Sequence, residues 1–401
     1  MLLEVSSTSE VDTARSPAWG GVFALSLGAF ALIASEFMPV SLLTPIASDL
    51  HITEGQAGQA ISVSGAFAVL TSLFISSVAG QLDRKLLLLA LTGLMILSGT
   101  IVAIAPNYEI FMVGRALIGG AIGGFWSMSA ATAMRLVPED KVPRALAILN
   151  GGNALATVIA APLGSFLGGL IGWRGTFFFV VPVAAIVFVW QLVSLPSMKT
   201  EARTSVAGVF KVLKRPVVAL GMAAVGIFFM GQFALFTYLR PFLETVAHVD
   251  VSTLSLLLLM MGVTGFIGTS LIGAFVKDGL YRTLIAIPIL MAFIASALVL
   301  SKGGVAMIAV MLGLWGLFAT SAPVGWWTWV ARTLPNDAEA GGGLMVAVVQ
   351  FAITFGATVG GLLFDMSGYQ ATFGISAALL LVAALLAVVT SRNGRLALQR
   401  A

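Results

Sequence analysis

Two ionisable residues, Glu36 and Arg115, lie well inside long apolar stretches of the chain. A charge at the centre of a bilayer costs about 2.5–3.5 kcal/mol on insertion scales, so such residues are functional candidates by default. Burial favours the neutral form of a carboxyl group, whereas a nearby guanidinium favours the ionised form. A carboxyl group between these influences can change protonation when its neighbour moves. The pair therefore predicts proton transfer, and the alternative is a permanent ion pair that joins two helices.

Pro39 lies one helical turn after Glu36. Because proline lacks a backbone N–H and crowds the carbonyl group of Ser35, we expect a bend beside the carboxyl group. At about 1.5 Å per residue, Glu36 lies roughly 15 Å from the end of its span, and Arg115 lies roughly 10 Å from the corresponding end of its own. We therefore expect both side chains at a similar depth, beside a water-accessible cavity.

The residue sets that other chemistries need are missing from the sequence. It has no cysteine, no Ser–His–Asp set, no cluster of metal ligands and no phosphate-binding glycine loop. Its two histidines, His51 and His248, fall between the apolar stretches. We therefore expect no enzymatic activity, no metal, no cofactor and no direct use of ATP.

The composition places the chain in a membrane. Of its 401 residues, 59% are hydrophobic and 9% are charged, whereas soluble proteins contain roughly 25% charged residues. This balance excludes a soluble enzyme, a nucleic-acid-binding protein and a disordered scaffold. Each spanning helix needs about 20 apolar residues, so the apolar content suffices for twelve.

Intervals without charged residues predict twelve spans. They are helices, because lipid cannot satisfy backbone polar groups and the intervals lack the alternation of a membrane barrel. The first continues past Glu36 to about Ile46, and the fourth begins near Tyr108. The intervals are 16–35, 55–82, 86–108, 116–134, 145–173, 175–198, 216–239, 251–276, 283–301, 303–331, 340–364 and 366–391.

The basic residues predict the orientation of the chain. Seventeen of the 21 Lys and Arg residues fall on the side of the two termini, which indicates that both termini are cytoplasmic in a multi-pass protein of the cytoplasmic (inner) membrane. No cleavable signal peptide is evident in residues 1–18. The fold class expected is an all-α integral membrane protein with twelve transmembrane helices. Residues 1–198 and 216–401 form two six-helix bundles, joined by a cytoplasmic linker at 199–215.

Glycines at four-residue spacing mark one face of several spans. Such faces allow helix backbones to approach closely in lipid, and the alternative is a smooth surface on which helices slide. Examples are Gly119 and Gly123, Gly164 and Gly168, and Gly356 and Gly360.

At these residues the chain resembles the major facilitator superfamily, in particular its twelve-span drug:proton antiporters. Asp83-Arg84-Lys85 is similar to the motif between spans two and three, with Ala79 in place of a usual glycine. The segment 115–119 resembles the fourth-span motif, whose arginine is associated with proton coupling, and 162–168 resembles the fifth-span motif of exporters. The resemblance implies a part for Arg115 in proton coupling, beside the proton-handling role expected of Glu36, and gating by Asp83, Arg84, Lys85, Pro162 and Gly164.

A narrower resemblance extends over nearly the whole chain. The segments 36–45, 125–130, 231–241 and 323–329 are similar to bacterial purine ribonucleoside efflux pumps. This resemblance implies a central cavity and export of nucleosides such as inosine against proton entry, by alternating access. The alternatives are an exporter of drugs or sugars, net import, and a membrane receptor or scaffold that transports nothing.

A substrate site is expected near the midplane between the halves. A neutral nucleoside requires flat apolar surfaces and uncharged hydrogen-bonding groups. The partners expected are this small molecule, protons and lipid; the oligomeric state is open, and a monomer is compatible with the sequence. Each amide among the candidates could instead form a hydrogen bond between two helices. The candidates are Gln59, Trp126, Asn150, Asn153, Gln232, Tyr238, Trp315 and Gln350.

Overall fold

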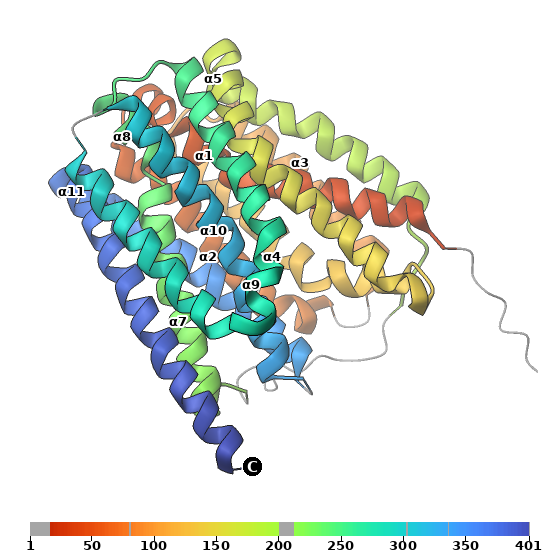
Figure 1. Ribbon diagram of the computed structural model, residues 1–401. Coiled ribbons are helices and arrows are strands. Elements are labelled where there is room, and N and C mark those ends of the chain that lie inside the picture. The colour runs from red at the N-terminus through yellow and green to blue at the C-terminus, as the bar shows by residue number, and fades with distance from the viewer. Residues whose placement is uncertain (1–16, 80–81, 200–211, 302–303, 336, 401) are drawn as a thin grey trace, which may run out of the picture.

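A computed structural model describes residues 17–79, 82–199, 212–301, 304–335 and 337–400. These residues form helices joined by short connections (Figure 1). The helices are α1 Trp19–Leu50, α2 Glu54–Ala79, α3 Arg84–Ile104, α4 Tyr108–Arg135, the short η1 Glu139–Lys141, α5 Val142–Ser194, α7 Pro216–Phe236, α8 Leu239–Thr245, α9 Val251–Leu300, α10 Val305–Thr333 and α11 Ala338–Arg400.

Within the described residues, nine helical segments are long and apolar enough to cross a membrane. Three of them, in α5, α9 and α11, are interrupted at Gly172, Gly279 and Gly368 respectively. Gly172 and Gly368 both have a φ of 73°, a left-handed conformation that glycine adopts without steric penalty. Because each interrupted helix contains two spans, the segments correspond to the twelve spans predicted from the sequence.

Close helix contacts explain the glycine spacing on α4. A Cβ atom at Gly119 would lie 2.2 Å from the backbone oxygen of Ser64, and one at Gly123 would lie 2.2 Å from that of Ala68. Both oxygens belong to α2, so any larger side chain would push the two helices apart. This confirms the interpretation of this face as a tight packing surface.

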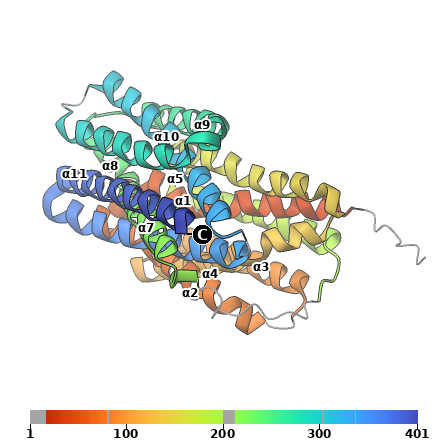
Figure 2. The same ribbon diagram turned by 60° about the horizontal axis from the view of Figure 1, so that its bottom comes forward.

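The buried apolar side chains form two clusters, one centred on α1–α5 and the other on α7–α11. In both views the helices of the first half, coloured red to yellow, lie mainly toward the right, and those of the second half, green to blue, lie mainly toward the left (Figures 1 and 2). Val40, Ile61 and Ala161 of the first half belong to the second cluster, so the halves pack against each other. The predicted boundaries at 198 and 216 stay a prediction, because residues 200–211 of the linker lie outside the described residues.

Candidate functional site

Glu36 lies at the boundary between the two halves and is only 2% exposed. Its carboxylate oxygen Oε1 accepts a hydrogen bond of 3.3 Å from the side-chain Nε2 of Gln350 in α11. Gln350 is itself 7% exposed, and its amide oxygen is buried without a hydrogen-bond partner. The buried carboxyl group therefore contacts the second half through one hydrogen bond, next to an unsatisfied acceptor.

Arg115 is buried beside the same segment of α1, at 1% exposure. Its Nη1 donates to the backbone oxygen of Ser35 at 2.8 Å, and its Nη2 donates to that of Glu36 at 3.0 Å. Two further hydrogen bonds go to α2, to the backbone oxygen of Ala60 at 3.1 Å and to Ser64 Oγ at 3.3 Å. The guanidinium group thus joins α4 to the backbones of α1 and α2.

The contact with Ser35 follows from Pro39, which removes the N–H that would bond this carbonyl group in a regular helix. Arg115 supplies the missing donor. Among the described residues, no ion pair joins Arg115 to the carboxylate of Glu36. The structure brings both residues to one segment of α1, a meeting that similar depth alone did not predict, and the guanidinium faces backbone oxygens while the carboxylate faces Gln350. Their role in proton coupling stays a prediction.

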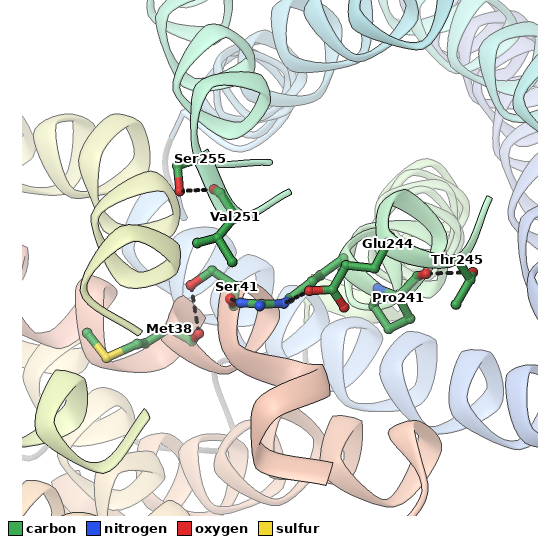
Figure 3. A network of polar contacts seen from close by, with 8 residues as sticks. Met38, Ser41, Pro241, Glu244, Thr245, Val251 and Ser255 are labelled. Atoms are coloured by element: carbon green, nitrogen blue, oxygen red, sulfur yellow. Dashed lines mark hydrogen bonds and ion pairs between the residues drawn. The ribbon is translucent and has the colours of Figure 1, made fainter. Parts of the chain in front are cut away.

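A second proline in α1 has the same relationship with a second arginine. Pro45 leaves the backbone oxygen of Ser41 without its helical donor, and Nη1 of Arg240 in α8 donates to that oxygen. Arg240 is 6% exposed, and its Nε donates to Oε1 of Glu244 at 2.8 Å. Figure 3 shows Ser41 and Glu244 as the two partners of these contacts, with the guanidinium group between them. The contact joins the two halves near the end of α1 that is remote from the chain termini.

Sequence reasoning placed Arg240 between two spans and gave it no role. Its partner is far away in the chain, so the pairing leaves no local pattern. The available signal was Pro45, which stands four residues after Ser41 and predicts a carbonyl group in need of a donor.

A polar seam joins α2 of the first half to α11 of the second. The hydroxyl group of Thr358 lies 3.2 Å from Oε1 of Gln59 and 2.9 Å from Oγ of Ser62. The Thr354 hydroxyl donates to the backbone oxygen of Ser62 at 3.3 Å. Gln59, a predicted substrate residue, therefore takes part in a contact between the halves.

The same seam ends at Asp365 of α11, which sequence reasoning also missed. Its Oδ2 accepts a hydrogen bond of 2.6 Å from Thr53, and its Oδ1 accepts one of 2.9 Å from the backbone N–H of Gly55. A carboxylate at a helix N-terminus satisfies free N–H groups and interacts favourably with the helix dipole. Asp365 therefore fastens the start of α2 to the second half, at the same end of the molecule as Arg240.

Two of the predicted substrate residues are buried in contacts between helices. Tyr238 is fully buried, donates to the backbone oxygen of Ala357 at 2.8 Å and stacks on Phe364 with 5.3 Å between ring centroids. Trp315 is 1% exposed within the core of the second half.

The remaining predicted substrate residues make contacts that do not involve Glu36. Asn150 is exposed and donates to the backbone oxygen of Leu146 in its own helix at 2.9 Å. Trp126 is half-buried against the core of the first half, and Asn153 is half-buried in α5. Gln232 in α7 carries a buried amide oxygen without a hydrogen-bond partner. The structure therefore brings Gln350 to Glu36 directly and places Gln59 on the adjoining seam.

Asp83 of the predicted gating motif caps the start of α3. It accepts hydrogen bonds from the backbone N–H groups of Lys85 at 2.8 Å and Met198 at 2.9 Å, and from the hydroxyl group of Ser197. The N–H of Arg84 donates to the backbone oxygen of Met198 at 3.0 Å. Burial raises the pKa of Asp83, but these hydrogen bonds outweigh burial and hold the pKa below its usual range. These contacts fasten the residues that follow α5 to the start of α3, within the first half, and a gating role stays a prediction.

Pro162 and Gly164, also predicted to act in gating, lie where α5 approaches two neighbours. A Cβ atom at Gly164 would lie 2.5 Å from Oγ of Ser41 in α1. Pro162 frees the carbonyl group of Val158, whose oxygen would lie 2.7 Å from a Cβ atom at Gly262 in α9. The proline thus lies one turn from a close contact between the halves.

Comparison with known proteins adds family information to this geometry. The family model for the Major Facilitator Superfamily matches residues 25–342. Transcription regulatory protein OpdE of Pseudomonas aeruginosa is 62% identical over 96% of this chain and 98% of its own. Purine ribonucleoside efflux pump NepI of Salmonella paratyphi B is 40% identical over 97% of this chain and 98% of its own.

Solved structures share the fold. The nucleoside transporter NupG superposes with a TM-score of 0.75 at 13% identity, over 92% of this chain and 98% of its own. The human organic anion transporter MFSD10 superposes with a TM-score of 0.68 at 14% identity, over 93% of this chain and 100% of its own.

Proposed function

Because the chain belongs to the Major Facilitator Superfamily, we propose that it exports purine ribonucleosides against proton entry by alternating access. The protein is a multi-pass membrane transporter of small molecules and not an enzyme. We place it in the cytoplasmic membrane with both termini in the cytoplasm. The observation that carries proton coupling is the buried carboxyl group of Glu36, which contacts the second half of the molecule through Gln350.

The nucleoside assignment is supported by the 40% identity to NepI, which is named a purine ribonucleoside efflux pump. Uncharged side chains at the boundary between the halves suit such a solute, because amides bond to ribose hydroxyls and purine edges without a buried charge. Gln232 offers a buried amide oxygen that has no partner. Gln59 offers an amide on the polar seam.

The name of OpdE, a relative at 62% identity, points to a second candidate function, the regulation of transcription. Export of a solute that a separate regulator senses would change transcription without any contact with DNA. We favour this indirect route, because the described residues form long apolar helices of the kind that cross a membrane.

The structure also supports a defined state in the transport cycle. At the end remote from the termini, Arg240 contacts Ser41 and Asp365 contacts the start of α2, so both polar contacts connect the two halves there. In our proposal this end faces the outside, and the state shown is closed toward the outside. Opening toward the outside would require both contacts to break.

Transport into inverted membrane vesicles tests the proposal. Energised vesicles with the wild-type protein should accumulate labelled inosine, and a proton uncoupler should abolish the accumulation. Glu36→Gln should reduce uphill accumulation to the level of vesicles without the protein, because the amide cannot carry the proton. Glu244→Gln is the matched control: Glu244 pairs with Arg240 at one end of the bundle, so proton-driven accumulation should persist.

Two outcomes would contradict the proposal at different points. Accumulation that neither the uncoupler nor Glu36→Gln reduces would show that transport is not coupled to protons. Failure of excess inosine to compete with any solute that the protein transports, in a panel of nucleosides, sugars and dyes, would remove the nucleoside assignment.

A further inference from the structure

The contact between Glu36 and Gln350 is incomplete in a specific way. The carboxylate accepts one hydrogen bond from Nε2 of Gln350, and the amide oxygen of Gln350 is buried without a donor. Buried polar atoms are normally hydrogen-bonded, and an unsatisfied one is costly. The two side chains come from different halves of the molecule, so any change in this contact acts on the boundary between them.

An ionised carboxylate cannot satisfy the amide oxygen, because both groups are acceptors. A neutral carboxylic acid can, since its O–H is a donor and its second oxygen remains an acceptor. A carboxylic acid and a primary amide can therefore form two hydrogen bonds at once, O–H to the amide oxygen and N–H to the acid oxygen. Protonation would add one hydrogen bond and remove one buried charge.

We propose that Gln350 is a positioning residue that reads the protonation state of Glu36 across the boundary between the halves. A proton from water at the open outer end converts the carboxylate to the acid, whose O–H then donates to the amide oxygen of Gln350. In this proposal the paired acid and amide hold the outer end closed, which is the state proposed above for this structure. Loss of the proton returns the pair to one hydrogen bond and favours opening. This inference rests on the proposed function, because it assigns a residue to proton coupling.

Few charged residues lie on the segments around Glu36, so the pair of Glu36 and Gln350 is the local switch. α4 contributes Arg115, whose donors go to backbone oxygens of α1 and α2 and to Ser64. α8 contributes Arg240 and Glu244 near Ser41, more than one turn further along α1. The remaining packed segments, 55–79, 86–104, 145–173, 216–236 and 340–364, contain no Asp, Glu, Lys, Arg or His.

The absence of cysteine from the sequence allows a direct test without substrate. Val40 lies one turn after Glu36, is 1% exposed and packs into the core of the second half. A single Val40→Cys substitution therefore places the one thiol of the chain at the closed boundary. Its rate of labelling by a membrane-impermeant maleimide, added outside right-side-out vesicles, reports opening. Each rate is divided by that of the unfolded protein at the same pH, which removes the pH dependence of thiol reactivity.

With this reporter, we expect labelling to be at least tenfold faster at pH 9 than at pH 5, because ionised Glu36 no longer satisfies Gln350. Gln350→Met keeps the length of the side chain but removes both amide functions. In this variant the reporter should be labelled rapidly at both pH values, so the two labelling rates become equal. Glu36→Gln replaces the acid by an amide, which can form the same two hydrogen bonds with Gln350 at any pH. It should label slowly at both pH values.

Gln59→Met is the matched control, since Gln59 is a second amide on the boundary that contacts Thr358 and not Glu36. It should loosen the boundary at both pH values and leave the tenfold ratio intact. The inference is overturned if Gln350→Met retains the wild-type ratio, or if Glu36→Gln labels as rapidly as Gln350→Met. The Glu36→Gln result decides the matter even if Gln350→Met fails to fold. Because labelling requires no solute, a failed inosine assay would overturn the proposed substrate and leave this result standing.

Discussion

Arg115 shows how a charge can be accommodated inside a membrane helix bundle without an ion pair. Its guanidinium donates four hydrogen bonds to oxygen atoms of Ser35, Glu36, Ala60 and Ser64. Three of these acceptors are backbone carbonyl groups, and the one on Ser35 has lost its helical donor to Pro39. The planar fork of arginine suits this set, whereas lysine presents a compact ammonium with three donors. At this residue, geometry matters more than charge alone.

We therefore predict that Arg115→Lys destabilises the protein although it retains the positive charge. Each buried acceptor left without a donor costs about 1–3 kcal/mol, so the apparent melting temperature in detergent should fall by several degrees, and further than in Glu36→Gln. Arg174→Lys is the matched control: Arg174 also donates to a backbone oxygen, that of Ala105, but its side chain is 35% exposed and water can replace it. Equal stability of Arg115→Lys and the wild type would show that charge is sufficient.

The sequence predicts the individual residues of the site unevenly. Glu36 and Arg115 stand out because each interrupts an apolar stretch, and a shared depth follows from counting residues. The partners of these side chains do not follow, because helix rotation decides whether Arg115 meets a carboxylate or a carbonyl group. Tyr238 and Trp315 share the composition of a substrate site but are buried in helix contacts. Amide and aromatic residue types alone do not distinguish a cavity from an interface.

Among the elements, α1 carries two prolines, Pro39 and Pro45, within one uninterrupted helix. Each proline frees one carbonyl group, and each of these groups is bonded by a buried arginine from another helix. Arg115 comes from the same half of the molecule, whereas Arg240 comes from the other half. The first contact therefore holds α1 within its own half, and the second holds the two halves together at one end.

This difference predicts a selective coupling between Pro45 and Arg240. Pro45→Ala restores an N–H group that can bond the Ser41 oxygen within the helix, so Arg240 is no longer its necessary donor. The stability lost in Arg240→Met should be smaller by about 1–3 kcal/mol in the Pro45→Ala background than in the wild type. Thermal unfolding of the two single variants and the double variant measures this coupling.

Pro39→Ala is the matched control for that experiment, because the carbonyl group freed by Pro39 is bonded by Arg115. Its effect should add to that of Arg240→Met without coupling. Equal coupling of Arg240→Met to both prolines would mean that the arginine responds to a general softening of α1 and not to the Ser41 carbonyl group.

The elements themselves could be predicted more completely than their contacts. The charge-free intervals give all twelve spans, and the breaks at Gly172, Gly279 and Gly368 lie beside charged residues that separate those intervals. Lipid exclusion of charge is a strong local signal. Asp365 was missed because it lies in such a break, where water can hydrate a charged side chain and no protein partner is expected. In the structure it nevertheless accepts hydrogen bonds from Thr53 and Gly55 at the start of α2.

At the scale of the whole molecule, the two halves meet along α1, α2 and α5 on one side and α7, α8, α9 and α11 on the other. In the part of the chain that the structure describes, the polar contacts between the halves at the end remote from the termini are made through Arg240 and Asp365. Such contacts can break and reform as units, which suits the rocking of one half against the other. The contact of Glu36 with Gln350 lies within the same boundary, so a proton there can bias the whole movement.

A charge balance over the full cycle gives the last prediction. If one proton enters for each neutral nucleoside that leaves, each cycle moves one positive charge inward, and a potential of 100 mV supplies about 2.3 kcal/mol. That energy supports a solute gradient of roughly fifty-fold, because each 1.4 kcal/mol is a factor of about ten. In proteoliposomes without a pH gradient, a potassium diffusion potential set with valinomycin should therefore drive uphill inosine movement by itself. Its direction should reverse with the sign of the potential.

Glu36→Gln, which carries no proton, should at most equilibrate inosine under the same potential. If only a pH gradient drives the wild-type protein, two charges must cancel in the cycle, and a single proton on Glu36 cannot be the whole of the coupling.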